Sequence, residues 1–252
     1  MENNKNNFIY SLYPTTKLII CLSLVILAFV LPTYVERFML LAIIHVLAIL
    51  SGKYLKFLKV SIFSVGILMI FIMFIQSLFY QGSNPNIVME IGIFSIKYEG
   101  IIKGLNLGSS VLVFGSAMLL FFQTTSIKDF IYSLEVNGMN SKASYVVLAT
   151  LQMIPQMHKS SQVIMSAQKS RGVETEGNLI VRAKAFLPTL VPLILSSIAN
   201  TEEKALTLEA RGFSAPLKKT QLMILNKRKI DSVLVSLMIV ITVIIILWRV
   251  IL

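Results

Sequence analysis

Two polar stretches of this 252-residue chain end in the same way. "SAQKSRGV" (Ser166–Val173) and "LTLEARGF" (Leu206–Phe213) each place a small residue, an arginine and a glycine after a run of helix-forming residues. The planar guanidinium of arginine has five N–H donors and can bind a carboxylate through two parallel hydrogen bonds. The repeated motif therefore predicts two helix ends that each present an arginine to an acidic partner.

The glycine of each motif explains why a helix would end there. Just past a helix C-terminus the backbone often takes the left-handed conformation, which glycine adopts without steric penalty. The preceding arginine then falls in the last turn, where the helix dipole favours a cation. A single Arg-Gly end needs no function beyond stability, but its repetition favours recognition of two partners. The candidate partner-binding residues are Lys169, Ser170, Arg171, Gly172, Glu209, Ala210, Arg211 and Gly212.

The composition sets the class of protein in which these motifs occur. Apolar residues make up 56% of the chain and charged residues 14%, which is typical of a membrane protein. The net charge of +11 then indicates cytoplasmic loops and contact with anionic lipids. No nucleic-acid-binding motif accompanies this charge. Cys21 is the only cysteine, so no internal disulfide is expected, and His45 is expected to be a neutral, packed histidine.

Stretches without charged residues predict the membrane spans. A helix needs about 20 apolar residues to cross a bilayer, with about 17 to 25 tolerated. The candidate spans are Leu18–Val35, Phe38–Gly52, Val60–Tyr80, Gly104–Ile127 and Ser232–Trp248. The second is short, and we expect Arg37 and Lys53 to extend their charges to the membrane interfaces. The sequence thus predicts an all-α membrane protein with about five transmembrane helices.

Basic residues predict the orientation and the domain organisation. The loop after the second span carries three lysines and no acidic residue, and Lys227–Lys229 precede the last span. Because cytoplasmic loops are enriched in Lys and Arg, both segments and the N-terminus are expected inside. Residues 1–123 would then hold four transmembrane helices and residues 231–252 the last one. Residues 124–230 would form a cytoplasmic or interfacial helical coupling domain inserted before that last span.

The predicted coupling domain contains two short apolar stretches, Ala143–Met157 and Ala185–Asn200. They hold Pro155, Pro188 and Pro192, and proline costs about 3 kcal/mol inside a helix. Bent or broken helices are therefore expected. We favour helices that lie at the inner membrane face. A sixth and a seventh span remain an alternative, since an even number of extra spans preserves the charge pattern.

The second arginine motif belongs to a longer pattern, "LPTLVPLILSSIANTEEKALTLEARGF" (Leu187–Phe213). Together with "KSRG" and "YPTTKL" (Tyr13–Leu18) it resembles the transmembrane T component of energy-coupling factor (ECF) transporters, a CbiQ-like family of ABC-type importers. That family has paired Ala-Arg-Gly motifs and an Asp-Pro-Arg-Thr-Lys-Leu stretch ahead of its first span. Here Ser170 stands in place of the first alanine, and Tyr13 in place of the acidic residue.

The resemblance implies a non-catalytic subunit in the cytoplasmic membrane of a prokaryote. In this family the T subunit joins two cytoplasmic ABC-type ATPases, identical or different, to a membrane S component that binds a vitamin or a metal ion. Arg171 would dock in one ATPase and Arg211 in the other, with Lys169 and Glu209 lining the contacts. ATP and Mg²⁺ would bind to the ATPases, and no cofactor is expected in this chain. It has no Gly-x4-Gly-Lys-Ser/Thr motif.

Three other functions remain as alternatives. A standalone secondary transporter predicts charged groups buried at mid-membrane, because such groups are costly and mark function, and the five spans have none. A membrane-bound enzyme predicts converging His, Asp or Ser residues near the inner face, where His158 is the only histidine. A membrane adaptor or receptor would share most features of the coupling subunit, and the sequence does not separate the two.

Overall fold

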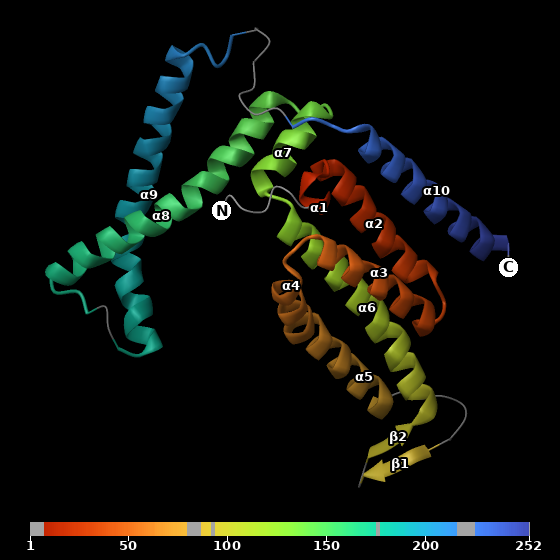
Figure 1. The fold of residues 1–252 in the computed structure, drawn as a ribbon. Coiled ribbons are helices and arrows are strands. Elements are labelled where there is room, and N and C mark those ends of the chain that lie inside the picture. The colour runs from red at the N-terminus through yellow and green to blue at the C-terminus, as the bar shows by residue number, and fades with distance from the viewer. Residues whose placement is uncertain (1–7, 80–86, 92–93, 175–176, 216–224, 252) are drawn as a thin grey trace. The chain divides into compact units, whose positions relative to one another are not determined.

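The structure, a computed structural model, describes residues 8–79, 87–91, 94–174, 177–215 and 225–251 (Figure 1). Its contacts divide the chain into two compact units. One unit is Met1–Asn137 with Leu225–Leu252, and the other is Gly138–Ile224. The predicted boundaries at residues 124 and 230 stay a prediction, and Tyr80, the predicted end of the third span, lies outside the described residues.

The first unit, called here the membrane unit, is built from helices that run up and down. They are α1 (Phe8–Ser11), α2 (Pro14–Val30), α3 (Tyr34–Leu50), α4 (Tyr54–Val60), the π-helical η1 (Ser61–Gly66), α5 (Ile67–Phe79), α6 (Tyr98–Thr124), α7 (Ile127–Val136) and α10 (Lys229–Ile251). A two-stranded antiparallel hairpin, β1 (Ile87–Ile91) and β2 (Phe94–Lys97), precedes α6.

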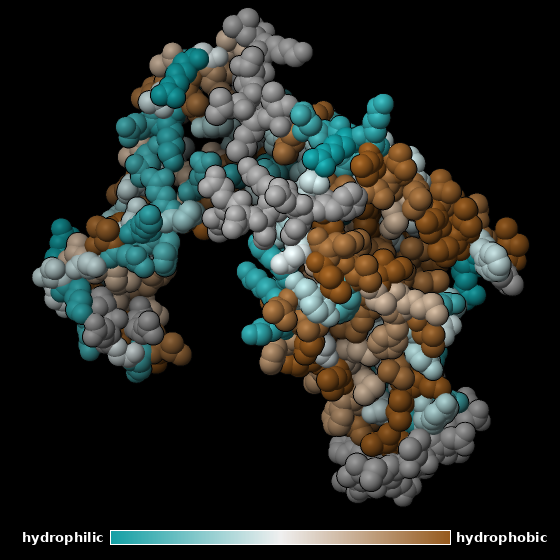
Figure 2. Space-filling view, in the orientation of Figure 1, coloured by the Kyte–Doolittle hydropathy of each residue, from teal (hydrophilic) through white to brown (hydrophobic). Residues whose placement is uncertain are grey.

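The helices of the described residues match the predicted fold class. The continuous helix Tyr54–Phe79, α6, α9 (Leu179–Ala210) and α10 are long and apolar enough to cross a membrane, and α2 is a shorter apolar helix. In Figure 2 apolar side chains cover most of the visible surface of the membrane unit. Phe63 and Phe74 are 72% and 59% exposed, an arrangement suited to lipid rather than to water. The prediction of an all-α membrane protein is confirmed.

Helix α6 lies at the centre of the membrane unit and packs against α2, α3 and α5. The core is an apolar cluster where these helices meet: Cys21, Leu24, Leu27, Ala28, Leu40, Ile44, Ala48, Phe57, Val113, Ala117, Leu120 and Phe121. Helix α10 packs on α2 at the edge of this group (Figure 1). His45 is part of the packing, because its ring meets Phe57 edge-on at 5.6 Å and its Nδ1 lies 2.9 Å from the carbonyl of Leu41.

Glycines bring α6 unusually close to α5. A Cβ atom on Gly104 would lie 2.9 Å from the Cα of Met73, and one on Gly100 would lie 2.6 Å from the carbonyl oxygen of Gln76. Small residues spaced by four along one helix face let two transmembrane backbones approach, and van der Waals contact then holds them together. The spacing of Gly100, Gly104 and Gly108 therefore fixes the α5–α6 pair.

Arg37 differs from its prediction, because its side chain turns inward and is only 8% exposed. Its Nε donates to the carbonyl of Ala28 at 2.9 Å, and Nη2 donates to that of Leu31 at 2.6 Å. Nη1 donates to the backbone carbonyl of Asn106 in α6. The last carbonyls of a helix have no partner within it. Arg37 satisfies carbonyls at the end of α2 and links that end to α6. Its charge is therefore buried among backbone carbonyls and does not extend to the membrane interface.

The second unit, called here the coupling unit, consists of α8 (Ser141–Ser170) and α9. Both helices run without interruption through their prolines, Pro155 in α8 and Pro188 and Pro192 in α9. Bent or broken helices were expected; the break is contradicted, and a bend at the prolines stays a prediction. A proline removes one backbone hydrogen bond; Pro192 has no N–H to donate to the carbonyl of Pro188, and the amide of Gln168 in α8 donates to that carbonyl instead. Because α9 has the length and composition of a span, its position relative to the membrane stays open.

Gly104→Ala should destabilise the membrane unit by about 1–3 kcal/mol, because overpacking a close backbone contact forces the helices apart. Thermal unfolding of the purified protein in detergent micelles would show this as a lowered midpoint. Gly66→Ala is the matched control, because a Cβ atom there would meet Ser61 at an ordinary 3.7 Å. Equal midpoints for the two variants would contradict the role of the glycine spacing.

Candidate functional site

The first arginine motif closes helix α8. The helix begins at Asn140, whose side chain accepts a hydrogen bond from the N–H of Lys142 at 2.9 Å, and such capping stabilises a helix start. At the other end the N–H of Gly172 donates to the carbonyl of Lys169 at 3.0 Å, and that of Val173 donates to Gln168 at 3.1 Å. These two bonds, with Gly172 at φ 85°, form a Schellman motif.

The second motif closes α9 with the same geometry. Asn178 caps the start of the helix by accepting from the N–H of Val181 at 3.0 Å. At the C-terminus the N–H of Gly212 donates to Glu209 at 2.9 Å, and that of Phe213 donates to Leu208 at 3.0 Å. Gly212 has φ 72°. The sequence therefore predicted both helix ends correctly, but it did not identify the two asparagine caps, which precede the helices at positions where asparagine is favoured.

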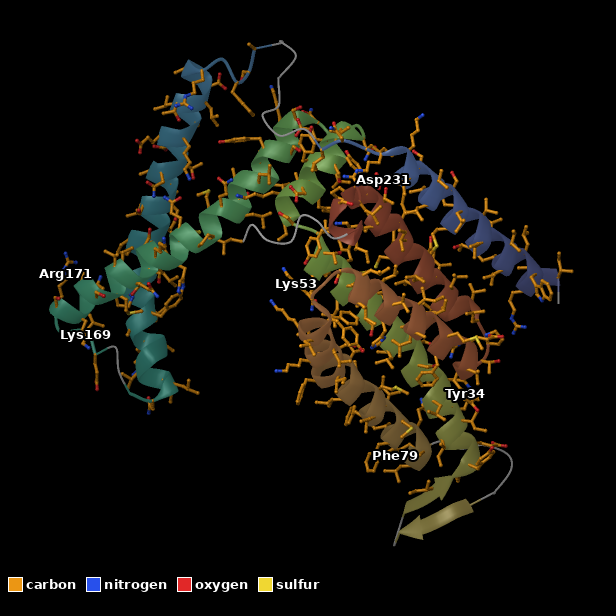
Figure 3. The ribbon with its side chains drawn as sticks, in the orientation of Figure 1. Tyr34, Lys53, Phe79, Lys169, Arg171 and Asp231 are labelled. Atoms are coloured by element: carbon orange, nitrogen blue, oxygen red, sulfur yellow. The ribbon has the colours of Figure 1, made fainter. Side chains whose placement is uncertain are left out.

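Each arginine is the C-cap residue that directly follows its helix, and the two have almost the same backbone conformation. Arg171 has φ −89° and ψ 9°, and Arg211 has φ −88° and ψ 6°. Both residues are exposed, and Arg171 is visible at the end of α8 in Figure 3. Within the described parts of the chain, neither guanidinium has a hydrogen-bond or ion-pair partner. The backbone carbonyls are satisfied by the Schellman bonds, so each helix end offers a free planar cation.

The surroundings of the two arginines differ. Beside Arg211, the hydroxyl of Ser214 donates to the carboxylate of Glu209, so an acidic group is held next to the arginine. Beside Arg171, the corresponding position is Lys169, and Ser170 donates its hydroxyl back to the carbonyl of Ser166 at 3.2 Å. The α8 end is therefore the more basic of the two. Each helix end offers a different charge pattern to its partner.

An aromatic pair positions the end of α9. The rings of Phe213 and Tyr145 lie 4.9 Å apart with an angle of 54° between their planes. Tyr145 is in the first turns of α8, whereas Arg171 follows its last residue. At 1.5 Å of rise per residue, the 26 residues between them span about 39 Å. The two arginine ends therefore lie on the order of 40 Å apart within the coupling unit, and they cannot bind in one groove.

The two helices cross between these ends. The amide of Gln168 donates to the carbonyl of Pro188 at 3.3 Å, and Lys204 donates to Gln156 at 3.3 Å. Figure 1 shows the crossing, from which the end of each helix projects. Beside it, an open apolar groove of about 400 Å³ is lined by Met157, Ile194, Ser197, Ile198, Thr201, Glu202 and Ala205.

Sequence reasoning identified the arginines but missed two parts of this arrangement. The Phe213–Tyr145 pair joins residues 68 positions apart, which periodicity along one helix does not show. The apolar groove likewise combines residues from both helices. Among the described residues, no group of three or more His, Cys, Asp or Glu side chains is placed to hold a metal ion.

Comparisons with known proteins place the sequence in a family. A sequence profile of the CbiQ family, described as cobalt transport protein, matches residues 5–222. A relative from Lacticaseibacillus paracasei is 30% identical, with 97% of this chain and 95% of the relative aligned. Another, from Lactococcus lactis, is 26% identical, with 96% and 94% aligned. Both are named energy-coupling factor transporter transmembrane protein EcfT.

Gly212→Ala should loosen the end of α9, because a side chain in the left-handed conformation costs about 1–2 kcal/mol. The N–H of Phe213, which closes the Schellman motif, should then exchange with solvent about fivefold faster or more. Hydrogen exchange followed by mass spectrometry would measure this. Gly212→Asn is the matched control, since asparagine tolerates this conformation. Equal exchange in both variants would show that the glycine does not stabilise the end.

Proposed function

The chain belongs to the CbiQ family, and we propose that it is the energy-coupling transmembrane subunit of an ECF transporter. In this role it links two cytoplasmic ABC-type ATPases to a membrane S component for uptake of vitamins or other micronutrients. The chain itself is non-catalytic. ATP and Mg²⁺ bind to the ATPases, and the coupling unit lies on the cytoplasmic side of the membrane. The names of its relatives and its apolar helices support this assignment.

The separation of the two arginine ends is the observation that carries the proposal. Arg171 and Arg211 share one backbone geometry, as expected if each meets a related surface. They lie on the order of 40 Å apart, which requires two binding sites. A pair of ATPase subunits provides two related grooves at different places. A single partner with one groove would leave one of the two matched ends without a use.

The chemistry of each contact follows from the exposed guanidinium. A carboxylate or a main-chain carbonyl in the ATPase groove would accept its hydrogen bonds, and a bidentate pair would fix the direction of the helix. The small residue before each arginine, Ser170 or Ala210, leaves room for the groove wall to approach. Lys169 and Glu209 line the contacts, and because their charges are opposite, the two grooves need different complementary charges.

Coupling then depends on the stiffness of α8 and α9. When ATP binding brings the ATPases together, each groove moves the helix end that it holds. Both helices are continuous through their prolines, so a displacement at either end reaches the crossing. We assign the S component to the apolar face that includes Met157, Ile194 and Ile198 beside the crossing. A methionine there adapts to different surfaces. Movement of the helices would reorient the S component and release its cargo inside.

Charge reversal of both arginines, Arg171→Glu with Arg211→Glu, should lower the recovery of the ATPase subunits at least about tenfold, because arginines at interface centres are frequent hot spots. The measurement is affinity purification of the tagged chain from membranes that contain all the subunits, with quantitative mass spectrometry. Each single reversal should weaken recovery less than the double one. Arg171→Lys should be impaired too, because lysine keeps the charge but loses the planar fork.

Lys159→Glu is the matched control, because it makes the same charge change at an exposed position within α8, away from its end. It should leave recovery of the ATPases unchanged. Wild-type recovery of both ATPases, together with full transport by the double variant, would refute the proposed docking. Nucleotide hydrolysis by the purified chain alone would refute the non-catalytic role.

A further inference from the structure

The short segment of residues 11–17, which runs from the end of α1 into the first turn of α2, contacts both connections between the membrane unit and the coupling unit. Its residues Ser11, Tyr13, Thr15 and Lys17 alternate along the chain and include three of the six residues of the "YPTTKL" stretch. We propose that these four residues form a clasp, the N-terminal clasp, that holds together the point where the chain leaves for the coupling unit and the point where it returns. The clasp would thereby position the coupling unit.

The returning chain is held through Asp231 in the first turn of α10. This aspartate is fully buried, and one of its carboxylate oxygens accepts from the N–H of Tyr13 at 2.9 Å. The other accepts from the N–H of Arg228 at 2.8 Å. The guanidinium of Arg228 donates to the hydroxyl of Ser11 at 3.3 Å. Figure 3 shows Asp231 at the start of α10, beside α2.

The departing chain is held through Asn137, which follows the last residue of α7. Its side-chain amide donates to the hydroxyl of Thr15 at 3.0 Å and to the carbonyl of Ser133 at 2.7 Å. The ammonium of Lys17 donates to the carbonyl of Thr124, the last residue of α6, at 2.9 Å. Gly138 comes next, with φ 112°, and begins the coupling unit. Thus one segment of seven residues reaches the chain on both sides of that unit.

The charges of the clasp match the helix ends that they meet. Asp231 lies at the starts of α2 and α10, where the helix dipole favours an anion, and Lys17 lies at the end of α6, where it favours a cation. Lys17 is attracted electrostatically to Asp129 in α7 and also to Asp231. Contacts of two lysines with an aromatic ring add to these interactions. The ammonium groups of Lys17 and Lys53 lie 5.6 and 5.2 Å from the centre of the Tyr10 ring, within range of cation–π attraction.

The clasp also accounts for a departure from the family pattern. Tyr13 precedes α2 and makes no side-chain capping bond, whereas the acidic residue of the family pattern could accept hydrogen bonds at that helix start. In this chain Asp231 supplies a carboxylate to the N–H of Tyr13 from another helix. The helix start therefore gains its anion only when α10 is in place. The hydrogen bond from Tyr13 to Asp231 therefore caps α2 and at the same time links it to the start of α10, where the chain returns from the coupling unit.

The function of the clasp rests in part on the proposed function. If the ATPases push on the coupling unit, its two connections must be anchored, or the displacement would be lost in movement of the chain near Asn137 and Arg228. The anchoring itself is a property of this chain and needs no partner. It can therefore be measured on the protein alone, separately from ATPase docking.

The test uses spin labels on two exposed lysine positions, Lys56 in α4 and Lys159 in α8, in a Cys21→Ala background in nanodiscs. Pulsed electron resonance measures the distribution of distances between the labels. Thr15→Val removes one clasp hydroxyl without changing its shape, and Asp231→Asn removes one acceptor. Each should shift the equilibrium between held and released connections about three- to tenfold, which broadens the distribution. The double variant should broaden it further.

Thr242→Val is the matched control, because its hydroxyl bonds only within α10, to the carbonyl of Met238 at 2.7 Å. It should leave the distribution unchanged. Distributions for Thr15→Val and Asp231→Asn that equal the control would overturn the clasp, whatever the ATPase recovery shows. Conversely, if the chain failed to recover the ATPases, the proposed docking would be refuted, but the clasp would not be affected. If Asp231→Asn does not fold, the isosteric Thr15→Val still decides the outcome.

Discussion

Helix ends leave backbone groups without partners, and a bilayer offers little water to satisfy them. The buried charged side chains of the membrane unit meet that constraint. Arg37 satisfies the last carbonyls of α2, and Lys17 satisfies the last carbonyl of α6. Asp231 serves the starts of α2 and α10. The membrane unit therefore uses its buried charges Lys17, Arg37 and Asp231 as links between helix ends.

The same constraint is met differently in the coupling unit. There α8 and α9 satisfy their last carbonyls with their own backbone, through the Schellman bonds at Gly172 and Gly212. The adjacent side chains, Arg171 and Arg211, are then not needed for capping and stay available. A helix end that used its arginine as Arg37 is used would have nothing to offer a partner. The glycine in each motif is thus what frees the arginine beside it.

The sequence predicted those features that depend on neighbours along the chain. The apolar runs predicted the helices of the membrane unit, and the Arg-Gly pairs predicted the ends of α8 and α9. It did not predict contacts between residues distant in sequence. Nothing in the stretch around Arg37 shows that its guanidinium would find carbonyls of α2 and α6. The Phe213–Tyr145 pair and the bond from Tyr13 to Asp231 depend on tertiary folding in the same way.

The prolines of the coupling unit show why a rule drawn from isolated helices does not predict a helix that packs against another one. Inside an isolated helix each proline removes a hydrogen bond and strains the turn before it, which predicted a bend or a break. In α9 the segment around Pro188 is instead held against α8, where Thr189 is buried and Gln168 donates to the carbonyl of Pro188. A carbonyl near a proline can thus gain a partner from another helix. This would make the crossing the point where α9 is best supported, as a lever that two partners move would require.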